Sequence, residues 1–385
     1  MHIFIPYRIC PIGAHSDHQY GFVSGFAINK GIHLNYTPNK DSICIVSSDN
    51  FTGAHRFDIH EIPDRQFDWA DHLRGAASVL SKHHHLRHGI NCSINGELPI
   101  GGLSSSAAVI IAFITAMAEV NDIHLSETEL INLALHAEND YVGVSCGKLD
   151  QSCEVYCRKD NLIYLDTKDD SYELIPMNPD CKPFEFAIFF SGLERTLAGS
   201  KFNMRVDELK AAAYALQAFA GMDYGKFEEA RLRNVPSEYF YQYKDQLPVN
   251  WMKRATHFYT EMERVHKGAE AWRRGDIRLF GQYVFESGHS SIYNYETGSP
   301  ELIKLYDLMC DTDGVYGGRF SGAGFKGCCM ALIDPSKRES IAEKVTAGYL
   351  SAFPAMRGKF SVHFCQTADG CGAYLQSNTS VGAIA

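Results

Sequence analysis

The sequence lacks several features that would assign it at once to a class of proteins. Its 385 residues carry 46 acidic against 36 basic side chains, for a formal net charge of −10. Proteins that bind nucleic acid usually show a basic excess, so the composition excludes no fold but disfavours a nucleic-acid partner. An acidic chain can still bind an anionic substrate in a locally basic pocket.

No run of apolar residues is long enough to cross a bilayer. The most apolar stretch, AAVIIAFITAMAEV, is too short and contains Thr115 and Glu119. The start, MHIFIPYRIC, has no basic segment before an apolar one and meets Pro6 at once, unlike a signal peptide. The 12 cysteines are dispersed and form no C-x-x-C pair, which is typical of reduced, intracellular proteins. We therefore expect a cytoplasmic protein without a membrane partner.

The chain is longer than one hydrophobic core usually covers, so two domains are expected. Strand-like runs open and close the sequence, and residues 205–274 follow a mostly helical pattern. Because strands and helices are grouped rather than strictly alternating, the pattern predicts an α+β fold. We place the domain boundary near residue 180, which gives domains 1–180 and 181–385.

The strongest local motif is LPIGGLSSSAAVIIAF, residues 98–113, where two glycines and three serines lead into an apolar helix predicted over about 105–120. Glycines let backbone N–H groups face a ligand, and a helix N-terminus favours negative charge. The composition is that of a phosphate-binding loop. It is not a Walker A loop, because no Gly-Lys-Ser/Thr follows the glycines. A serine-capped helix after a turn is the alternative.

Three further stretches carry polar or glycine-rich chemistry. Residues 136–156, HAENDYVGVSCGKLDQSCEVY, place Glu138 and Asp150 where two carboxylates could hold a metal and orient a hydroxyl, the alternative being a solvated helix end. Residues 317–329, GGRFSGAGFKGCC, form a glycine turn that brings backbone close to a ligand or makes a tight hairpin. Residues 7–21, YRICPIGAHSDHQYG, gather hydrogen-bonding side chains where a first strand should end.

In order and spacing, these four stretches resemble the signature segments of the GHMP kinase superfamily, and within it the galactokinase branch. RICPIGAHSDHQYG is similar to its sugar-binding signature and LPIGGLSSSAA to its ATP phosphate loop. YVGVSCGKLDQ resembles the segment with its catalytic aspartate, and SGAGFKGC its C-terminal glycine motif. The resemblance implies two domains, an N-terminal one like ribosomal protein S5 domain 2 and a C-terminal ferredoxin-like one, with the active site between them.

The resemblance also implies the roles of individual residues. Asp150 would accept or orient the proton of the sugar's anomeric hydroxyl, and Arg8 would keep Asp150 ionised and stabilise charge on the transferred phosphoryl group. Ser106 and Glu138 would hold Mg²⁺. The remaining positions fall into two groups: those expected to cradle the phosphates of ATP are Gly101, Gly102, Ser104, Ser105 and Ser106, and those expected at the sugar are Ala14, His15, Asp17, Gly147 and Phe202.

Ala14 points to a particular sugar. Galactokinases typically carry glutamate at this position, near the C6 hydroxyl, and tyrosine where this chain has Phe202. Both changes are shared with the galacturonokinase branch, which RICPIGAH closely resembles. We therefore expect an ATP-dependent enzyme that makes galacturonate 1-phosphate. Lys148, Arg195 and Lys326 are candidate partners for the substrate carboxylate.

Two alternatives remain at this point. One is a galactokinase with relaxed contacts at C6. The other is a non-catalytic sugar and ATP sensor. Such proteins tend to lose residues of the serine-containing segment GGLSSSAA, called the serine loop below, and these residues are present here. In either case the partner is a monosaccharide such as galacturonate or galactose, and the chain is a monomer or a homodimer.

Overall fold

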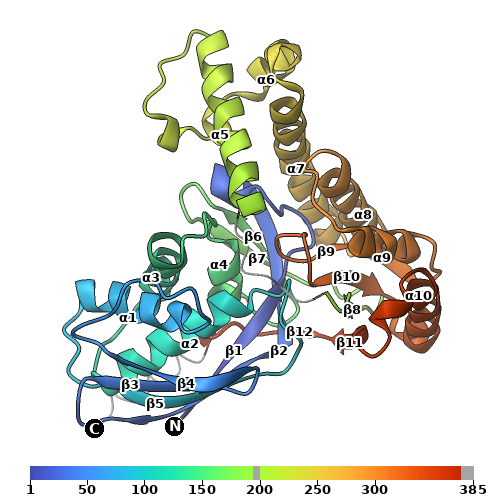
Figure 1. The fold of residues 1–385 in the computed structure, drawn as a ribbon. Coiled ribbons are helices and arrows are strands. Elements are labelled where there is room, and N and C mark those ends of the chain that lie inside the picture. Colours follow the sequence, from blue (N-terminus) through green and yellow to red (C-terminus); the bar gives the residue numbers. More distant parts are fainter. Residues whose placement is uncertain (194–199, 374–385) are drawn as a thin grey trace.

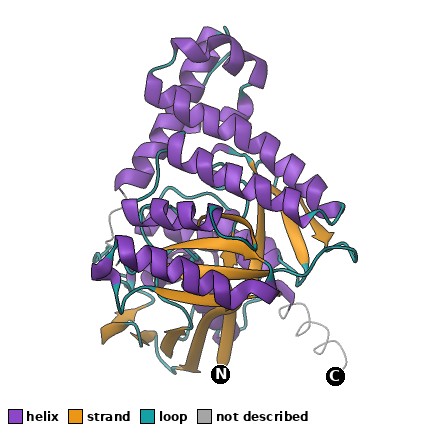
Figure 2. Cartoon of the chain, turned by 90° about the vertical axis from the view of Figure 1, so that its right-hand side faces the viewer, coloured by secondary structure: helices purple, strands orange, loops and turns teal. Residues whose placement is uncertain are grey.

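The computed structural model describes residues 1–193 and 200–373 of the chain. It has two sheets packed with helices, and a group of helices that rises above them (Figure 1). In the turned view of Figure 2, long helices cover the face of the strands. The predicted α+β class is confirmed.

The first sheet has the strand order β4-β3-β5-β2-β6-β7, with β1 and β12 also paired to β2. Only β3 and β5 run parallel among the pairs described. Side chains of β5 alternate between buried and exposed, as expected for a strand with one face on the core. The strands of this sheet are β1 (His2–Ile9), β2 (Phe22–Pro38), β3 (Ile43–Ser48), β4 (Phe51–Asp58), β5 (Ile90–Gly96), β6 (Asn161–Asp166), β7 (Tyr172–Pro176) and β12 (Thr367–Ala368).

Helices α2 and α4 pack on this sheet, and α1 and α3 pack against α2 (Figure 1). They are α1 (Asp71–His83), α2 (Ser105–Val120), α3 (Glu127–His136) and α4 (Leu149–Tyr156). Helix α2 is apolar on nearly all sides and is buried accordingly. It matches the helix predicted after the serine loop. Helix α3 begins with a side-chain cap, because the Ser126 hydroxyl accepts the Glu129 N–H at 3.2 Å. It ends at His136, and the chain continues as a π-helical turn, Ala137–Val142.

The second sheet has the order β11-β8-β10-β9. Its strands are β8 (Glu185–Phe190), β9 (Val315–Phe320), β10 (Cys328–Ile333) and β11 (Ser361–Cys365). Strands β8 and β10 are buried along their whole length, which fits their mostly apolar composition. The helices of this half are α5 (Ser200–Phe219), α6 (Ser237–Tyr243), α7 (Val249–Arg273), α8 (Ile277–Tyr293), α9 (Pro300–Cys310) and α10 (Arg338–Ala352).

The boundary predicted near residue 180 falls between β7 of the first sheet and β8 of the second. The largest group of buried apolar side chains nevertheless includes residues from both sides of that point, such as Phe26 and Phe186. The division into two domains therefore stays a prediction. In the described part of the chain, no helix is both long and apolar enough to cross a membrane.

Candidate active site

Strand β1 and helix α4 bring Arg8 and Asp150 into direct contact. Nε and Nη2 of Arg8 each lie 2.7 Å from Oδ1 of Asp150, and the Arg8 side chain is almost fully buried. Burial lowers the pKa of this guanidinium, but the Asp150 carboxylate outweighs burial and the net pKa is raised. Ser104 donates its hydroxyl to Oδ2, and Nη1 of Arg8 donates to the carbonyl of Gly102 at 3.1 Å. Both carboxylate oxygens of Asp150 are therefore fixed, and Arg8 ties them to the serine loop.

The serine loop turns through left-handed backbone before α2 begins at Ser105. The φ angles of Gly101, Gly102 and Ser104 are +133°, +91° and +61°. Glycine adopts such angles freely, whereas for serine they are uncommon. The turn leaves the N-terminus of a long helix free of a side-chain cap from Ser104. Unsatisfied N–H groups and the helix dipole at this end suit an anion such as a phosphate.

The glycine turn between β9 and β10 packs directly on the serine loop. A Cβ on Gly101 would lie 3.0 Å from the Cα of Gly327, and one on Gly322 would lie 2.8 Å from the Cα of Gly102. The Ser321 hydroxyl donates to the carbonyl of Gly102 at 2.6 Å. Ser321 and Gly102 are 219 residues apart in sequence, so two distant motifs form one structure at the site.

Glu138 and Ser106 are the magnesium ligands predicted from the sequence. Glu138 is buried in the π-helical turn, and its Oε2 accepts from Nε2 of Gln151 at 2.7 Å. Gln151 directly follows Asp150, so the two carboxylates lie on neighbouring parts of the site. Hydroxyl and carboxylate oxygens suit Mg²⁺, which usually takes one or two protein ligands together with substrate phosphates. Within the described ranges, no group of three or more His, Cys, Asp or Glu side chains could hold a metal. The role of Ser106 and Glu138 as magnesium ligands stays a prediction.

His15 occupies a buried turn between β1 and β2. Its φ is +65°, and its ring stacks on Tyr295 with 4.3 Å between centroids. Burial, followed by the charge of Arg319, holds the pKa of this imidazole well below its usual value, so the ring is neutral. Nε2 of His15 is buried and has no hydrogen-bond partner among the described residues. A buried polar atom without a partner is costly, and a hydroxyl of a bound sugar would satisfy it.

Asp17, two residues after His15, packs against the start of α4, where Asp150 is located. Its Oδ2 accepts from the backbone N–H of Leu149 at 3.4 Å. A Cβ at Gly147 would lie 2.6 Å from Cγ of Asp17, so a larger residue there would displace the carboxylate. Burial and then the Asp150 carboxylate raise the pKa of Asp17 to about 6. The predicted residues Asp17, Gly147 and Asp150 are thus brought together.

Ala14 directly precedes His15, whereas Phe202 comes much later in the chain. Both nevertheless lie near the same turn. Ala14 is buried, and its carbonyl accepts a hydrogen bond from Nε2 of His257 at 3.0 Å. Phe202, in α5, meets His18 edge-to-face with 5.9 Å between ring centroids. His18 belongs to the same signature, and its Nε2 lies 3.3 Å from the hydroxyl of Tyr295.

Comparison with known proteins agrees with this geometry. Residues 71–158 match the GHMP kinases N terminal domain, and residues 269–350 match the GHMP kinases C terminal family. A galacturonokinase of Arabidopsis thaliana is 37% identical over an alignment that covers 97% of this chain and 93% of the relative. The chain belongs to the GHMP kinase superfamily.

Other relatives place this GHMP kinase in the galactokinase branch. A galactokinase of Roseiflexus sp. (strain RS-1) is 31% identical, with 97% of this chain and 92% of the relative covered. The crystal structure of Lactococcus lactis galactokinase complexed with galactose superposes with a TM-score of 0.88 at 27% identity, covering 96% of this chain and 94% of that one. This GHMP kinase is therefore an ATP-dependent sugar-1-kinase with a monosaccharide substrate.

The candidates for binding a substrate carboxylate have different positions in the GHMP kinase. Nζ of Lys148 lies 2.5 Å from Oδ2 of Asp170, so this lysine already forms an ion pair. Lys326 belongs to the glycine turn. Arg195 lies outside the described residues.

The turn Gly13–Ala14–His15 is surrounded by residues from the second half of the GHMP kinase, and sequence reasoning missed these residues. Tyr295 stacks on His15, while His257 and Glu261 on α7 bind the backbone of the turn. One signal was available, because residues 257, 261 and 264 are polar and recur at helical spacing on a long helix. Such a stripe also describes an ordinary solvated face, and only the fold shows that it is buried.

Proposed function

We propose that this GHMP kinase transfers the γ-phosphoryl group of ATP to the anomeric hydroxyl of galacturonate, giving galacturonate 1-phosphate and ADP. The observation that carries the choice of sugar is Ala14, a methyl group in a buried turn where galactokinases typically carry glutamate. At ~4 Å and an effective dielectric of ~20, a glutamate would repel a carboxylate at C6 by about 4 kcal/mol. The 37% identity to a galacturonokinase supports the same substrate.

Asp150 is the proposed base for the anomeric hydroxyl. Its Oδ1 is held by two nitrogens of Arg8, so Oδ2, where Ser104 now donates, is the oxygen open to the sugar. As the hydroxyl oxygen bonds to the γ-phosphorus, its proton passes to Oδ2 and the bond from that phosphorus to the β–γ bridging oxygen breaks. In phosphoryl transfer, such positioning matters more than covalent catalysis.

Arg8 has a second proposed role in stabilising charge on the phosphoryl group. It contacts both Asp150 and the carbonyl of Gly102, so its positive charge lies between the base and the serine loop. Backbone N–H groups of Gly101 and Gly102, with the hydroxyls of Ser105 and Ser106, would bind the phosphates of ATP. Donors fixed in advance stabilise the transition state without the cost of reorganising.

Ser106 and Glu138 would hold Mg²⁺, which neutralises charge on the β- and γ-phosphates when it is bound. The sugar would lie against the turn that contains Ala14 and His15. His15 Nε2 and the Asp17 carboxylate would bind its hydroxyls, since the first has no partner in the described structure and the second retains free acceptor capacity.

The likeness to galactokinases favours a second candidate function. Galactokinases of several organisms are about as long as this chain and align with most of it. A galactokinase that tolerates Ala14 would prefer galactose. A non-catalytic sensor is less well supported, because Arg8, Asp150 and the serine loop are present and are assembled in one place.

The experiment that tests the proposal is an ADP-release assay with galacturonate, galactose, glucuronate and N-acetylgalactosamine. We expect kcat/KM to be highest for galacturonate. A preference for galactose would replace the proposal with the galactokinase alternative, and no ADP release with any sugar would favour a sensor. The cytoplasmic location and the state of monomer or homodimer remain predictions from the sequence.

A further inference from the structure

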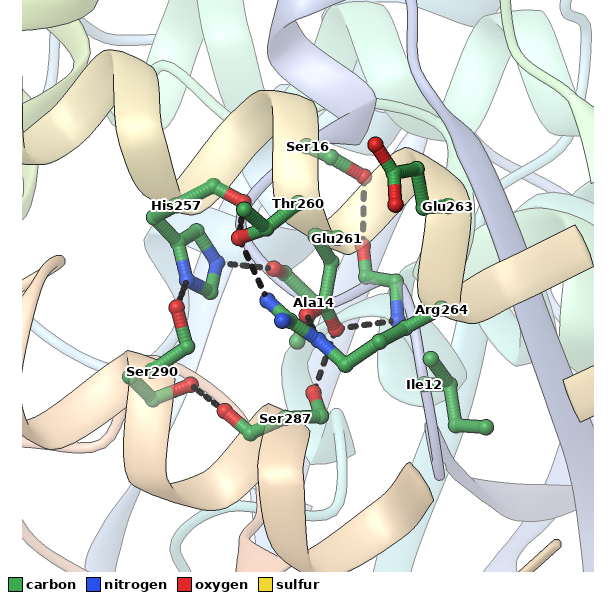
Figure 3. A network of polar contacts seen from close by, with 12 residues as sticks. Ile12, Ala14, Ser16, His257, Thr260, Glu261, Glu263, Arg264, Ser287 and Ser290 are labelled. Atoms are coloured by element: carbon green, nitrogen blue, oxygen red, sulfur yellow. Dashed lines mark hydrogen bonds and ion pairs between the residues drawn. The ribbon is translucent and has the colours of Figure 1, made fainter. Parts of the chain in front are cut away.

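A buried polar network connects helices α7 and α8 to the sugar-binding turn (Figure 3). Its centre is Glu261, which is fully buried. Oε1 of Glu261 accepts the backbone N–H of Gly13 at 2.7 Å and also the hydroxyl of Ser287. Oε2 accepts Nε of Arg264 at 2.8 Å, and Nη1 of Arg319 lies 3.6 Å from Oε1.

The negative charge of Glu261 is compensated by its neighbours. Burial raises the pKa of Glu261, but Arg264, His257 and Arg319 outweigh burial, and the pKa falls to about 2. Glu261 is therefore a carboxylate at any working pH. A buried charge needs such partners. In the described contacts, the only backbone group bound to the Glu261 carboxylate is the N–H of Gly13.

His257 binds the next residue of the same turn. Its Nε2 must donate, because the carbonyl of Ala14 can only accept, and the distance is 3.0 Å. Nδ1 then accepts from the hydroxyl of Ser290 at 2.9 Å. Figure 3 shows Ala14 between His257 and Glu261, with both side chains projecting from one helix toward it.

The turn needs to be held, because its backbone is unfavourable. Gly13 has a φ of +104° and His15 a φ of +65°, and the second of these is uncommon for a residue with a side chain. Such conformations persist where the surroundings fix them. If the turn relaxed, the ring of His15 would leave its stack on Tyr295, and its unpartnered Nε2 would no longer lie where it does.

We propose that Glu261 and His257 are positioning residues of the sugar site, which hold the turn Gly13–Ala14–His15 so that it presents His15 and the Ala14 methyl to the substrate. Neither residue is placed against the nucleotide or the reacting atoms. This inference rests on the proposed function only in taking that turn as the sugar-binding element.

The test uses two pairs of variants of the whole enzyme. His257→Gln keeps an N–H donor near the position of Nε2, whereas His257→Leu removes it at similar size. Ser287→Ala removes one hydrogen bond to Glu261 but leaves the carboxylate, and it is informative even if Glu261→Gln fails to fold. Glu263→Gln is the matched control, because Glu263 is on the same helix, is 57% exposed and pairs with Lys267.

We expect His257→Leu to raise KM for the preferred sugar by about tenfold, the equivalent of one good hydrogen bond. KM for ATP should change little, His257→Gln should restore most of the sugar affinity, and Glu263→Gln should behave like wild type. Parallel increases in both KM values, or equal effects of His257→Leu and His257→Gln at equal thermal stability, would overturn the inference. Because the preferred sugar is found first with the wild type, a preference for galactose would contradict the proposed substrate and leave this test intact.

Discussion

Arg8 and Asp150 are joined by two contacts of equal length, from Nε and Nη2 of one guanidinium to a single carboxylate oxygen. The pair connects β1, at the start of the chain, with α4, about 140 residues later. It leaves the second carboxylate oxygen to the hydroxyl of Ser104 in the serine loop. The proposed base, its cationic partner and the serine loop are therefore one hydrogen-bonded unit, and the first prediction concerns its centre.

Asp150→Asn should remove most turnover and leave ATP binding nearly intact. The amide cannot take the proton of the anomeric hydroxyl, and general-base catalysis typically contributes about a hundred- to ten-thousand-fold. Steady-state kcat and the Kd for ATP, measured by calorimetry on a variant with wild-type circular dichroism, check this. A folded variant that keeps more than about a tenth of wild-type kcat would contradict the assigned role.

Ser106→Ala and Glu138→Gln should each raise the concentration of Mg²⁺ needed for half-maximal activity. Each change removes an oxygen ligand or its charge from the proposed metal site. The control is Asp140→Asn, because Asp140 lies in the same π-helical turn but its side chain is 60% exposed. If Ser106→Ala and Glu138→Gln both titrate with Mg²⁺ as the control does, the metal is bound elsewhere.

Ala14→Glu should reverse the choice of sugar. A carboxylate at this position repels a carboxylate at C6 but can accept a hydrogen bond from a C6 hydroxyl. The ratio of kcat/KM for galacturonate to that for galactose should fall, and the fall should be equivalent to about 1–4 kcal/mol. The lower value is expected if water enters the pocket. Buried charges are weakly screened, so added salt should change the ratio little.

Ala14→Gln is the matched control for that experiment, because it adds the same volume without charge. We expect it to lower activity with both sugars and to change their ratio less than Ala14→Glu does. An unchanged ratio in Ala14→Glu would show that this position does not distinguish a carboxylate from a hydroxyl at C6 of the sugar.

Asp17→Asn should stabilise the folded protein at neutral pH. The pKa of Asp17 is about 6 in the folded protein, against roughly 4 in an unfolded chain. Below pH 4 the group is protonated in both states. Between pH 4 and 6 the folded state retains a proton that the unfolded chain has lost, so stability falls as pH rises.

Above pH 6 this cost, on the order of 1–3 kcal/mol, is fully present in the wild type and absent in the variant. Urea unfolding at pH 4 and pH 7.5 measures it, and the advantage of Asp17→Asn should appear only at the higher pH. The same variant should bind sugar more weakly. A variant that is equally stable at both pH values, or that binds sugar normally, would show that Asp17 is not a strained ligand-binding carboxylate.

Local motifs predicted the parts of this site that lie within one loop or helix end. The helix after the serine loop and the end of the first strand near Arg8 follow from composition and spacing, and the family resemblance assigns the roles of Arg8 and Asp150. The short helix α4, which begins beside Asp150, was not predicted. The hydrogen bond from Ser104 to Asp150 could not be predicted, because it depends on a left-handed serine that sequence patterns disfavour.

The wall of the site formed by α7 and α8 could not be predicted for a different reason. Gly13 and Glu261 are 248 residues apart, and nothing near either residue indicates the other. A buried charge cluster has the same residue types as a solvated helix face. Its burial is decided by how the two halves of the chain pack, which is a property of the whole fold and not of any segment.

The contact between the serine loop and the glycine turn limits how this enzyme can evolve. At Gly101, Gly322 and Gly327 one backbone lies against another, and at Gly102 an added Cβ would meet the Cys328 sulfur and the Ser321 carbonyl, so there is little room for a methyl group. Mutation can change the proposed sugar site one side chain at a time, for instance at Ala14, but it cannot do the same in the serine loop. We therefore expect sequences that descend from this one to diversify in the sugar they accept long before they change the phosphate donor.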